Sequence, residues 1–194
     1  NSLKSFELSE SFNQSLATQV RWLAKRLEWH LLGNHLFANA KALVFAGLYF
    51  QGNEANAWLK SGLKIISRQV DEQVLDDGGN FERSPMYHAI FLEDLLDLIN
   101  LANTFSIKID PELIERWRKV AKKMFSWLKL MTHPDGQIAL FNDAAFGVAP
   151  SLTDLEAYAA RLGLDFENKE NPAVLDNKHI SIHQLKESGY IIIF

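Results

Sequence analysis

Apolar residues recur at helical spacing through most of the first 165 residues, and this periodicity restricts the chain to a mainly helical fold. The segments that carry it are, by residue number, about 16–32, 35–50, 55–75, 85–104, 111–131 and 152–162. Some have a single apolar stripe, whereas 35–50 and most of 85–104 are apolar nearly all round, as buried helices are. Antiparallel helix pairs in an inner and an outer layer produce this alternation. We therefore predict an incomplete (α/α) toroid, with a compact helical bundle as the alternative.

Capping residues indicate where these helices begin and end. Ser84-Pro85 and Asp110-Pro111 each combine a preferred N-cap residue with proline at the first helical position. Gly33 is expected to end the first helix as its C′ residue. Asn34 is expected to be the N-cap of the second helix.

The pattern changes toward the end of the chain. From His179 it becomes strand-like, and it closes on the apolar run Tyr190–Phe194. We predict a partial toroid domain over 1–165, a linker over 166–178 and the beginning of a β domain over 179–194. Because the chain opens without Met and ends on an apolar strand, we expect it to be a fragment of a longer protein.

Composition excludes several classes of protein. The 194 residues contain no cysteine, which excludes disulfides, thiolate metal sites and a cysteine nucleophile. A formal net charge of −4 argues against a nucleic-acid partner, whose binding domain would be basic. No apolar run is long enough to predict a membrane span, and the first ten residues lack the layout of a signal peptide.

Unusual polar residues gather at two expected helix starts, Gly33–His35 and Asp77–His88. Helix N-termini favour anions through their N–H groups and their dipole. If the two helices lie parallel in an inner layer, both starts face one mouth. Each residue also has a plain structural interpretation: Asn34 is an ordinary N-cap, and Tyr87 suits a half-buried aromatic position.

Taken together, the two segments resemble a known family. GNHLFANAKALVFAGLYF (33–50) followed by DGGNFERSPMYH (77–88) is similar to the heparinase II/III-like polysaccharide lyases, which include heparin/heparan-sulfate lyases and oligo-alginate lyases. The resemblance covers 29–101 best and continues weakly through HPDGQIALFNDAAFG (133–147). HISIHQLKESGYIIIF (179–194) resembles the start of the family's C-terminal β-sandwich, where Ser-Gly-Tyr often opens the first strands.

The resemblance implies β-elimination on a uronate-containing polysaccharide or oligosaccharide. A proton leaves C5, beside the carboxylate, and the glycosidic oxygen leaves C4. The carboxylate must be neutralised, because proton removal builds a second negative charge beside it. Asn34 and His35 match the positions that bind it, and Tyr87 matches the catalytic tyrosine, a phenol that needs nearby positive charge for activation.

Other residues are expected to bind substrate by the same resemblance. Arg83 and His88 are candidates to tune the tyrosine or to bind acid groups of the substrate. Glu82 is expected to orient the arginine or to contact a sugar hydroxyl. Phe81 and Trp29 are candidates to stack on sugar rings, with core packing as the alternative interpretation of both.

The chain departs from the family in its missing β domain. The family commonly uses a further histidine there, as a base or at a metal site, and neither His179 nor His183 aligns with it. No cluster in this segment has metal-ligand spacing, so no cofactor or metal is expected in it. The resemblance also implies a periplasmic or secreted location, and the fragment alone is expected to hold only part of a site.

Two other functions remain as alternatives. One is a carbohydrate-binding or scaffold toroid without turnover. The other is a glycoside hydrolase, which needs two carboxylates at one mouth. Glu82 with Asp77 or Asp143 are the candidates for that pair. A tyrosine at the centre of the motif favours elimination instead.

Overall fold

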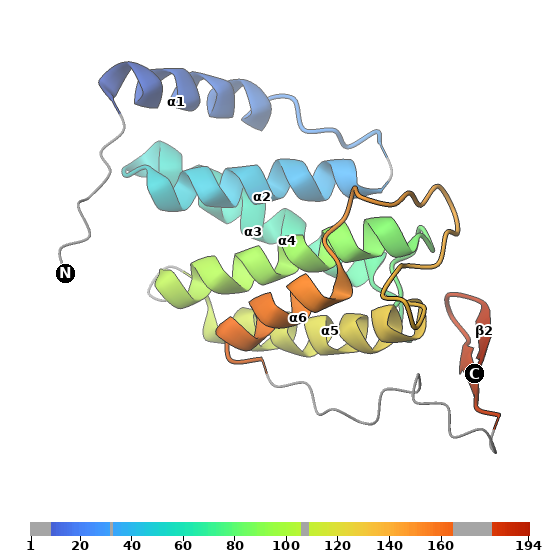
Figure 1. The fold of residues 1–194 in the computed structure, drawn as a ribbon. Helices are drawn as coiled ribbons and strands as arrows, with labels where there is room; N and C mark the ends of the chain where they lie inside the picture. The colour runs from blue at the N-terminus through green and yellow to red at the C-terminus, as the bar shows by residue number, and fades with distance from the viewer. Residues whose placement is uncertain (1–8, 32, 106–108, 165–179) are drawn as a thin grey trace. The chain divides into compact units, whose positions relative to one another are not determined.

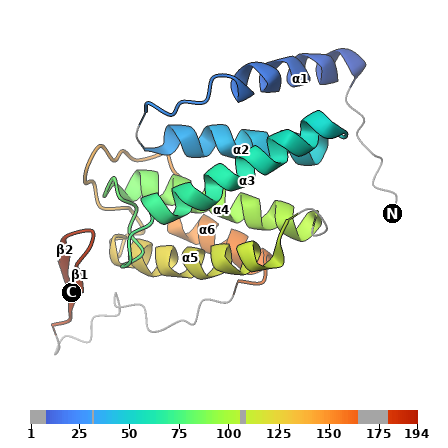
Figure 2. The ribbon, with the colours of Figure 1, turned by 180° about the vertical axis from the view of Figure 1, so that it is seen from behind.

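The structure, a computed structural model, describes residues 9–31, 33–105, 109–164 and 180–194. Its elements are α1 (Glu10–Ala24), α2 (Asn34–Tyr49), α3 (Asn53–Gln73), α4 (Pro85–Thr104), α5 (Pro111–Leu130), α6 (Leu152–Arg161), β1 (Ile182–Leu185) and β2 (Tyr190–Ile193) (Figures 1 and 2). The predicted mainly helical class with a short β segment is confirmed. The chain divides into two compact units, residues 1–66 and 67–194, and the division falls within α3.

In the first unit, α1 packs against α2, and both share a core with the start of α3. The buried members of this core are Val20, Leu43, Ala46, Ala55 and Trp58. Glycines allow α2 and α3 to approach closely. A Cβ at Gly47 would lie 2.6 Å from the Cβ of Leu59, and a Cβ at Gly62 would lie 2.8 Å from the carbonyl oxygen of Ala40. Larger residues at either glycine would force the helices apart.

The prediction of a first helix over 16–32 is wrong at both ends, since α1 runs over Glu10–Ala24. The predicted C-terminal end is too late because Leu27 keeps the helical spacing of apolar residues and packs on the core, although it lies in a turn beyond the helix. The side chain of Asn39, in α2, stabilises that turn. The side-chain oxygen of Asn39 accepts the backbone N–H of Glu28 (3.0 Å), and the Asn39 amide donates to the Glu28 carboxylate (2.9 Å).

The boundary residues of α2 also differ from the prediction. Gly33 is the N-cap of α2 and not the C′ residue of the preceding helix, and Asn34 is the first helical residue and not the cap. The backbone of Gly33 has φ +85° and ψ −148°, a conformation that essentially only glycine adopts. The cap position therefore falls on the glycine.

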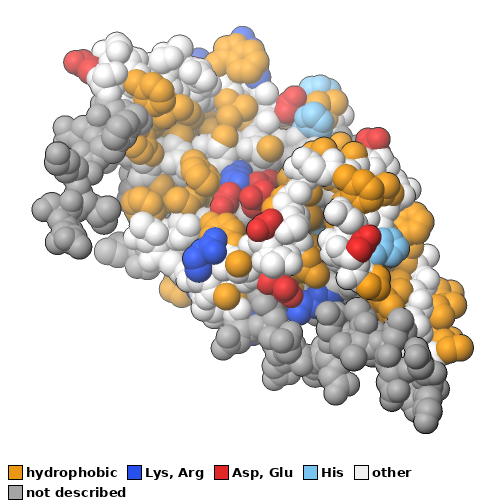
Figure 3. All heavy atoms as spheres, viewed as in Figure 1, with side chains coloured by type: hydrophobic (Ala, Val, Ile, Leu, Met, Phe, Trp, Pro, Cys, Tyr) orange, Lys and Arg blue, Asp and Glu red, His pale blue; other side chains and the backbone are white. Residues whose placement is uncertain are grey.

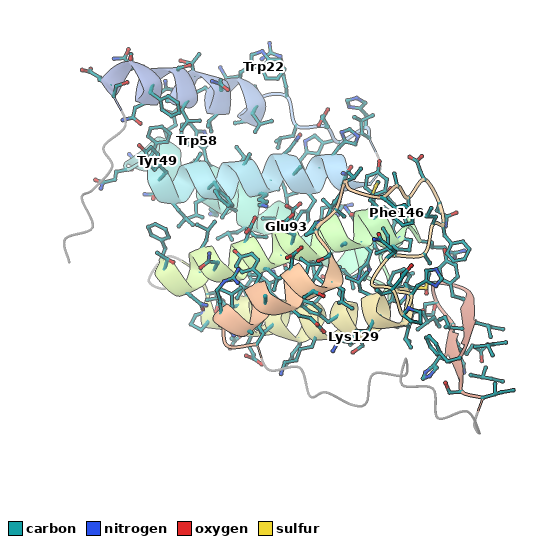
Figure 4. All side chains as sticks on the ribbon, viewed as in Figure 1. Trp22, Tyr49, Trp58, Glu93, Lys129 and Phe146 are labelled. Carbon is teal, nitrogen blue, oxygen red and sulfur yellow. The ribbon has the colours of Figure 1, made fainter. Side chains whose placement is uncertain are left out.

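In the second unit, α4 packs against α5 and α6. The predicted starts of α4 and α5 are confirmed, with Ser84 and Asp110 as N-caps that accept backbone N–H groups and proline at the first helical position. Lys129 of α5 pairs with Glu156 of α6 at 2.9 Å (Figure 4). The fully buried side chains of α4 include Phe91, Leu92, Leu95, Leu96, Leu98 and Ile99.

β1 and β2 form an antiparallel hairpin, as the strand-like pattern predicts. Leu185 of the hairpin joins a small core with Trp127, Met131 and Ala139, against which Tyr190 and Ile192 also pack. The opposite face carries exposed isoleucines, and hydrophobic side chains gather over the hairpin at the lower right of Figure 3. The predicted linker, 166–178, and His179 lie outside the described residues.

Among the described residues, no helix combines the length and the apolar character that crossing a membrane requires.

Candidate functional site

Three of the predicted site residues lie in the first unit, around the start of α2. Asn34 and His35 occupy its first turn, which contains no acidic residue. Asn34 is half-buried and His35 is exposed. The Nδ1 atom of His35 lies 3.6 Å from a carboxylate oxygen of Glu28. Trp29 lies on the connection before α2 and is 59% exposed, so its ring is available to a ligand and the core interpretation does not hold.

The loop of residues 74–84, in the second unit, carries the other motif into α4. A carboxylate oxygen of Asp77 accepts the backbone N–H of Gly79 at 3.0 Å, which closes the turn. Gly78 has φ +89°, and a Cβ there would collide with the carbonyl oxygen of Lys123 on α5. Glycine is required because it tolerates positive φ and has no Cβ. The Asp-Gly-Gly sequence therefore lets the loop lie directly on α5.

The residues around the start of α4 differ in exposure. Tyr87 lies in the first turn and is half-buried, and its backbone N–H donates to the Ser84 hydroxyl oxygen at 3.4 Å. Phe81 and Glu82 are also half-buried, whereas Arg83 is exposed. Like the first turn of α2, that of α4 contains no acidic residue.

Arg83 has an unusual backbone for a residue with a side chain, with φ +59°. Its N–H donates to the carbonyl oxygen of Asn80 at 2.9 Å. Its own carbonyl oxygen accepts the hydroxyl of Tyr190 (2.7 Å) and the side-chain amide of Asn142 (3.0 Å). Left-handed backbone is unfavourable for non-glycine residues and persists where surrounding contacts hold it. Here those contacts come from the loop, from β2 and from the segment after α5.

His88 does not have the geometry of a substrate-binding residue. Its ring has no exposed surface and stacks on Trp127 with centroids 4.4 Å apart. Its Nδ1 atom accepts the backbone N–H of Asn80 (3.2 Å), and its Nε2 atom lies 2.9 Å from the carbonyl oxygen of Met124. Burial lowers the pKa of His88 to about 4, so the imidazole is neutral at pH 7. The structure thus corrects the predicted role: the ring holds the loop against α5.

Several residues that support this loop are not predicted by any local pattern in the sequence. Ser188, Tyr190 and Asn142 contact it directly, although they lie 59 to 111 positions from their partners in the loop. The Ser-Gly-Tyr sequence at 188–190 could have indicated such a supporting role, because it stood out as a motif without a chemical role. Exposed Phe146, labelled in Figure 4, lies on the same segment as Asn142.

The predicted residues fall into two groups. Trp29, Asn34 and His35 belong to residues 1–66, and Phe81–Arg83, Tyr87 and His88 belong to residues 67–194. In the part of the chain that the structure describes, no three His, Asp or Glu side chains are grouped so that they could hold a metal ion.

Comparison with known proteins points to one family. The family described as Heparinase II/III N-terminus matches residues 3–162. A heparin-sulfate lyase of Bacteroides stercoris is 33% identical over 113 residues, which are 58% of this chain and 17% of that protein. A heparin-sulfate lyase of Bacteroides thetaiotaomicron is 31% identical over 122 residues, with the same coverage of each chain.

Solved structures agree with the sequence relatives. The crystal structure of a heparinase III is similar with a TM-score of 0.57 and 26% identity, over 72% of this chain and 20% of that one. The similarity confirms the predicted fold class, part of an α-toroid. The chain spans about 17% of the length of the curated relatives it matches. Because the family match covers most of its residues, the chain belongs to the Heparinase II/III N-terminus family.

Proposed function

We propose that this chain is part of a polysaccharide lyase that cleaves uronate-containing glycans by β-elimination, with glycans of the heparan-sulfate type as the first candidates. One observation carries the proposal: the motif residues Asn34, His35 and Tyr87 occupy the first turns of α2 and α4. Among the described helices, these two first turns lack an acidic residue, whereas those of α1, α3, α5 and α6 each contain one. Helix starts without their own carboxylates favour an anionic ligand.

The proposed roles of Asn34 and His35 follow from the charge that develops in the reaction. Removing the C5 proton beside an ionised carboxylate creates an enolate-like dianion. The amide of Asn34 and a ring N–H of His35 would donate hydrogen bonds to the carboxylate oxygens. A carboxylate oxygen of Glu28 lies 3.6 Å from the Nδ1 atom of His35, where it would help to orient the ring.

Tyr87 is proposed to move the protons. Its half-buried position in the first turn of α4 leaves part of the side chain open to a ligand. The phenol would take the C5 proton or donate one to the leaving glycosidic oxygen at C4. Exposed Arg83, half-buried Glu82 and Phe81, and exposed Trp29 are proposed to contact the sugar rings and their acid groups.

The glycoside hydrolase alternative is weakened by the surroundings of Asp77. One of its carboxylate oxygens accepts the Gly79 N–H, and the other accepts the N–H (2.7 Å) and the hydroxyl (2.8 Å) of Ser188. Burial alone would raise the pKa of Asp77, but these hydrogen bonds together lower it. A general acid needs a raised pKa, so Asp77 is unsuited to that role.

The test uses the full-length protein and a panel of uronate glycans, including heparan sulfate and alginate. The expected product carries a C4–C5 double bond, which is followed by its ultraviolet absorbance. Tyr87→Phe should lower kcat by about 10²–10⁴-fold, the usual contribution of a general acid or base. Tyr49→Phe is the matched control, since the Tyr49 hydroxyl lies outside both motifs and donates to the side-chain oxygen of Asn13 at 2.8 Å.

Two results would contradict the proposal. A folded full-length protein that releases no unsaturated product from any uronate glycan would favour the non-catalytic binding function. Full activity in Tyr87→Phe would remove Tyr87 from the reaction.

We further propose a periplasmic or secreted location, because such polysaccharides lie outside the cytoplasm. Fractionation of cells that express the full-length protein tests this location.

A further inference from the structure

The turn of the β-hairpin is joined to the Asp-Gly-Gly loop by a compact set of hydrogen bonds. Ser188 is 1% exposed, and both its N–H and its hydroxyl donate to one carboxylate oxygen of Asp77, at 2.7 and 2.8 Å. The indole N–H of Trp127 donates to the Ser188 hydroxyl oxygen at 2.9 Å. A Cβ at Gly79 would lie 2.6 Å from that indole nitrogen and 3.0 Å from the Ser188 Cβ. The turn therefore lies directly on the loop.

The next residues of the hairpin reach the strained backbone of Arg83. The hydroxyl of Tyr190 donates to the Arg83 carbonyl oxygen at 2.7 Å, and the Asn142 amide donates to both of these oxygen atoms, at 3.0 and 3.2 Å. A Cβ at Gly189 would lie 3.8 Å from a terminal nitrogen of the Arg83 guanidinium. The hairpin thus contacts Arg83 at its carbonyl group and close to its charged end.

We propose that Tyr190 is a positioning residue, which acts through Arg83 by holding its left-handed backbone and so directing its guanidinium toward the substrate. Ser188 supports this contact by fixing the hairpin turn to Asp77. The inference deepens the proposed function and rests on the part given there to Arg83. Without the Tyr190 hydroxyl, the Arg83 carbonyl loses one of its two donors, and its backbone can relax toward negative φ. Such a change would turn the side chain to another direction and would alter the entry of the chain into α4.

The packing of Tyr190 allows its hydroxyl to be tested separately from its ring. The ring lies 5.2 Å from the ring of Phe141 and 6.1 Å from that of Trp127, centroid to centroid. Tyr190→Phe keeps these ring contacts and removes the hydroxyl, which donates to the Arg83 carbonyl oxygen and accepts the Asn142 amide. The control is Tyr158→Phe in α6, which removes a hydroxyl that donates to Asp97 of α4 at 2.8 Å.

The first measurement is steady-state kinetics of the full-length protein on a uronate oligosaccharide. Tyr190→Phe should raise KM by about tenfold, as the loss of one charge-assisted contact does, with kcat changed by less than about twofold. In an Arg83→Ala background the same substitution should add nothing, because its effect passes through Arg83. A general structural role would lower the activity equally in both backgrounds, and that result would overturn the inference.

The second measurement needs no activity. Amide hydrogen exchange should become faster at Ser84–His88 in Tyr190→Phe and in Ser188→Ala, and should stay unchanged there in Tyr158→Phe. Asn142→Gly is a further variant that removes the second donor while glycine tolerates the φ of +49° at that position. Unchanged exchange in all three hairpin and loop variants would refute the positioning role. If exchange responds but no uronate glycan is cleaved, the proposed function fails and the inferred contact stands.

Discussion

The burial of His88 should make the stability of the second unit depend on pH in the weakly acidic range. Burial lowers the pKa of His88 to about 4 from an ordinary value of 6.5, and the Met124 carbonyl and the Asp77 charge oppose this shift only in part. The unfolded chain therefore binds a proton below pH 6.5 that the folded chain refuses until about pH 4. The contribution of the neutral ring is fully present above pH 6.5 and is lost as the pH falls toward 4.

The size of the effect follows from the width of this interval. Each pH unit in which only the unfolded chain binds the proton is worth about 1.36 kcal/mol. Between pH 7 and pH 5 the free energy of unfolding should fall by about 2 kcal/mol. That loss corresponds to a decrease of about 1 M in the urea midpoint. The geometry gives the reason: Nδ1 accepts the Asn80 N–H, and a proton on Nδ1 would place two donors face to face.

Urea unfolding at pH 7 and pH 5, followed by circular dichroism, tests this in the wild type and in His88→Gln. Glutamine does not titrate, and its amide can donate to the Met124 carbonyl as Nε2 does. The variant should be less stable at pH 7 and should lose about 2 kcal/mol less on acidification than the wild type. All other histidines are present in both proteins, so the difference isolates His88. Equal pH dependence of the two proteins would refute the reasoning.

Other substitutions test further contacts. Trp127→Phe should lower the free energy of unfolding by about 1–3 kcal/mol, because the hydrogen bond to Ser188 is lost. Trp117→Phe should lower the free energy of unfolding by less, because the buried Trp117 indole nitrogen has no hydrogen-bond partner among the described residues. Urea unfolding of both variants compares the two losses, and equal losses would contradict the argument. Gly62→Ala should destabilise the chain by about 1–3 kcal/mol, since its Cβ would lie 2.8 Å from a carbonyl oxygen of α2; an unchanged melting temperature would rule out this close approach. Burial alone would raise the pKa of Asp77, but its hydrogen bonds lower it, so its contribution is present above about pH 4 and is lost as the pH falls below that. Asp77→Asn should therefore flatten the acid side of the stability profile, measured by unfolding between pH 5 and pH 2.

Local signals in the sequence were sufficient for most helix boundaries in the second unit. Ser84 and Asp110 accept backbone N–H groups within three positions of themselves, so their roles depend on neighbours in the chain alone. The end of α1 was predicted wrongly because it depends on Asn39, which binds Glu28 from eleven positions away. Apolar spacing continued through Leu27 although the helix did not.

The positions of the motif residues along the helices were predicted more readily than their surroundings. The capping signal Ser84-Pro85 placed Tyr87 at a helix start, where the structure has it. That signal did not reveal that His88, the next residue, turns inward and is enclosed by Trp127 and the carbonyl of Met124. Nor did any local pattern join Asp77 to Ser188, 111 positions away. Such contacts arise when separate segments pack, which sequence spacing does not encode.

That long separation has a consequence for the order of folding. Asp77 and Ser188 meet only after a loop of more than a hundred residues closes, and closing a long loop costs entropy before any contact repays it. The hairpin strands have four residues each, too few to be stable in water by themselves. We therefore expect helix pairing to come first and hairpin docking last. Pulse-labelled exchange that protects the Ser188 amide as early as those of α4 would contradict this order.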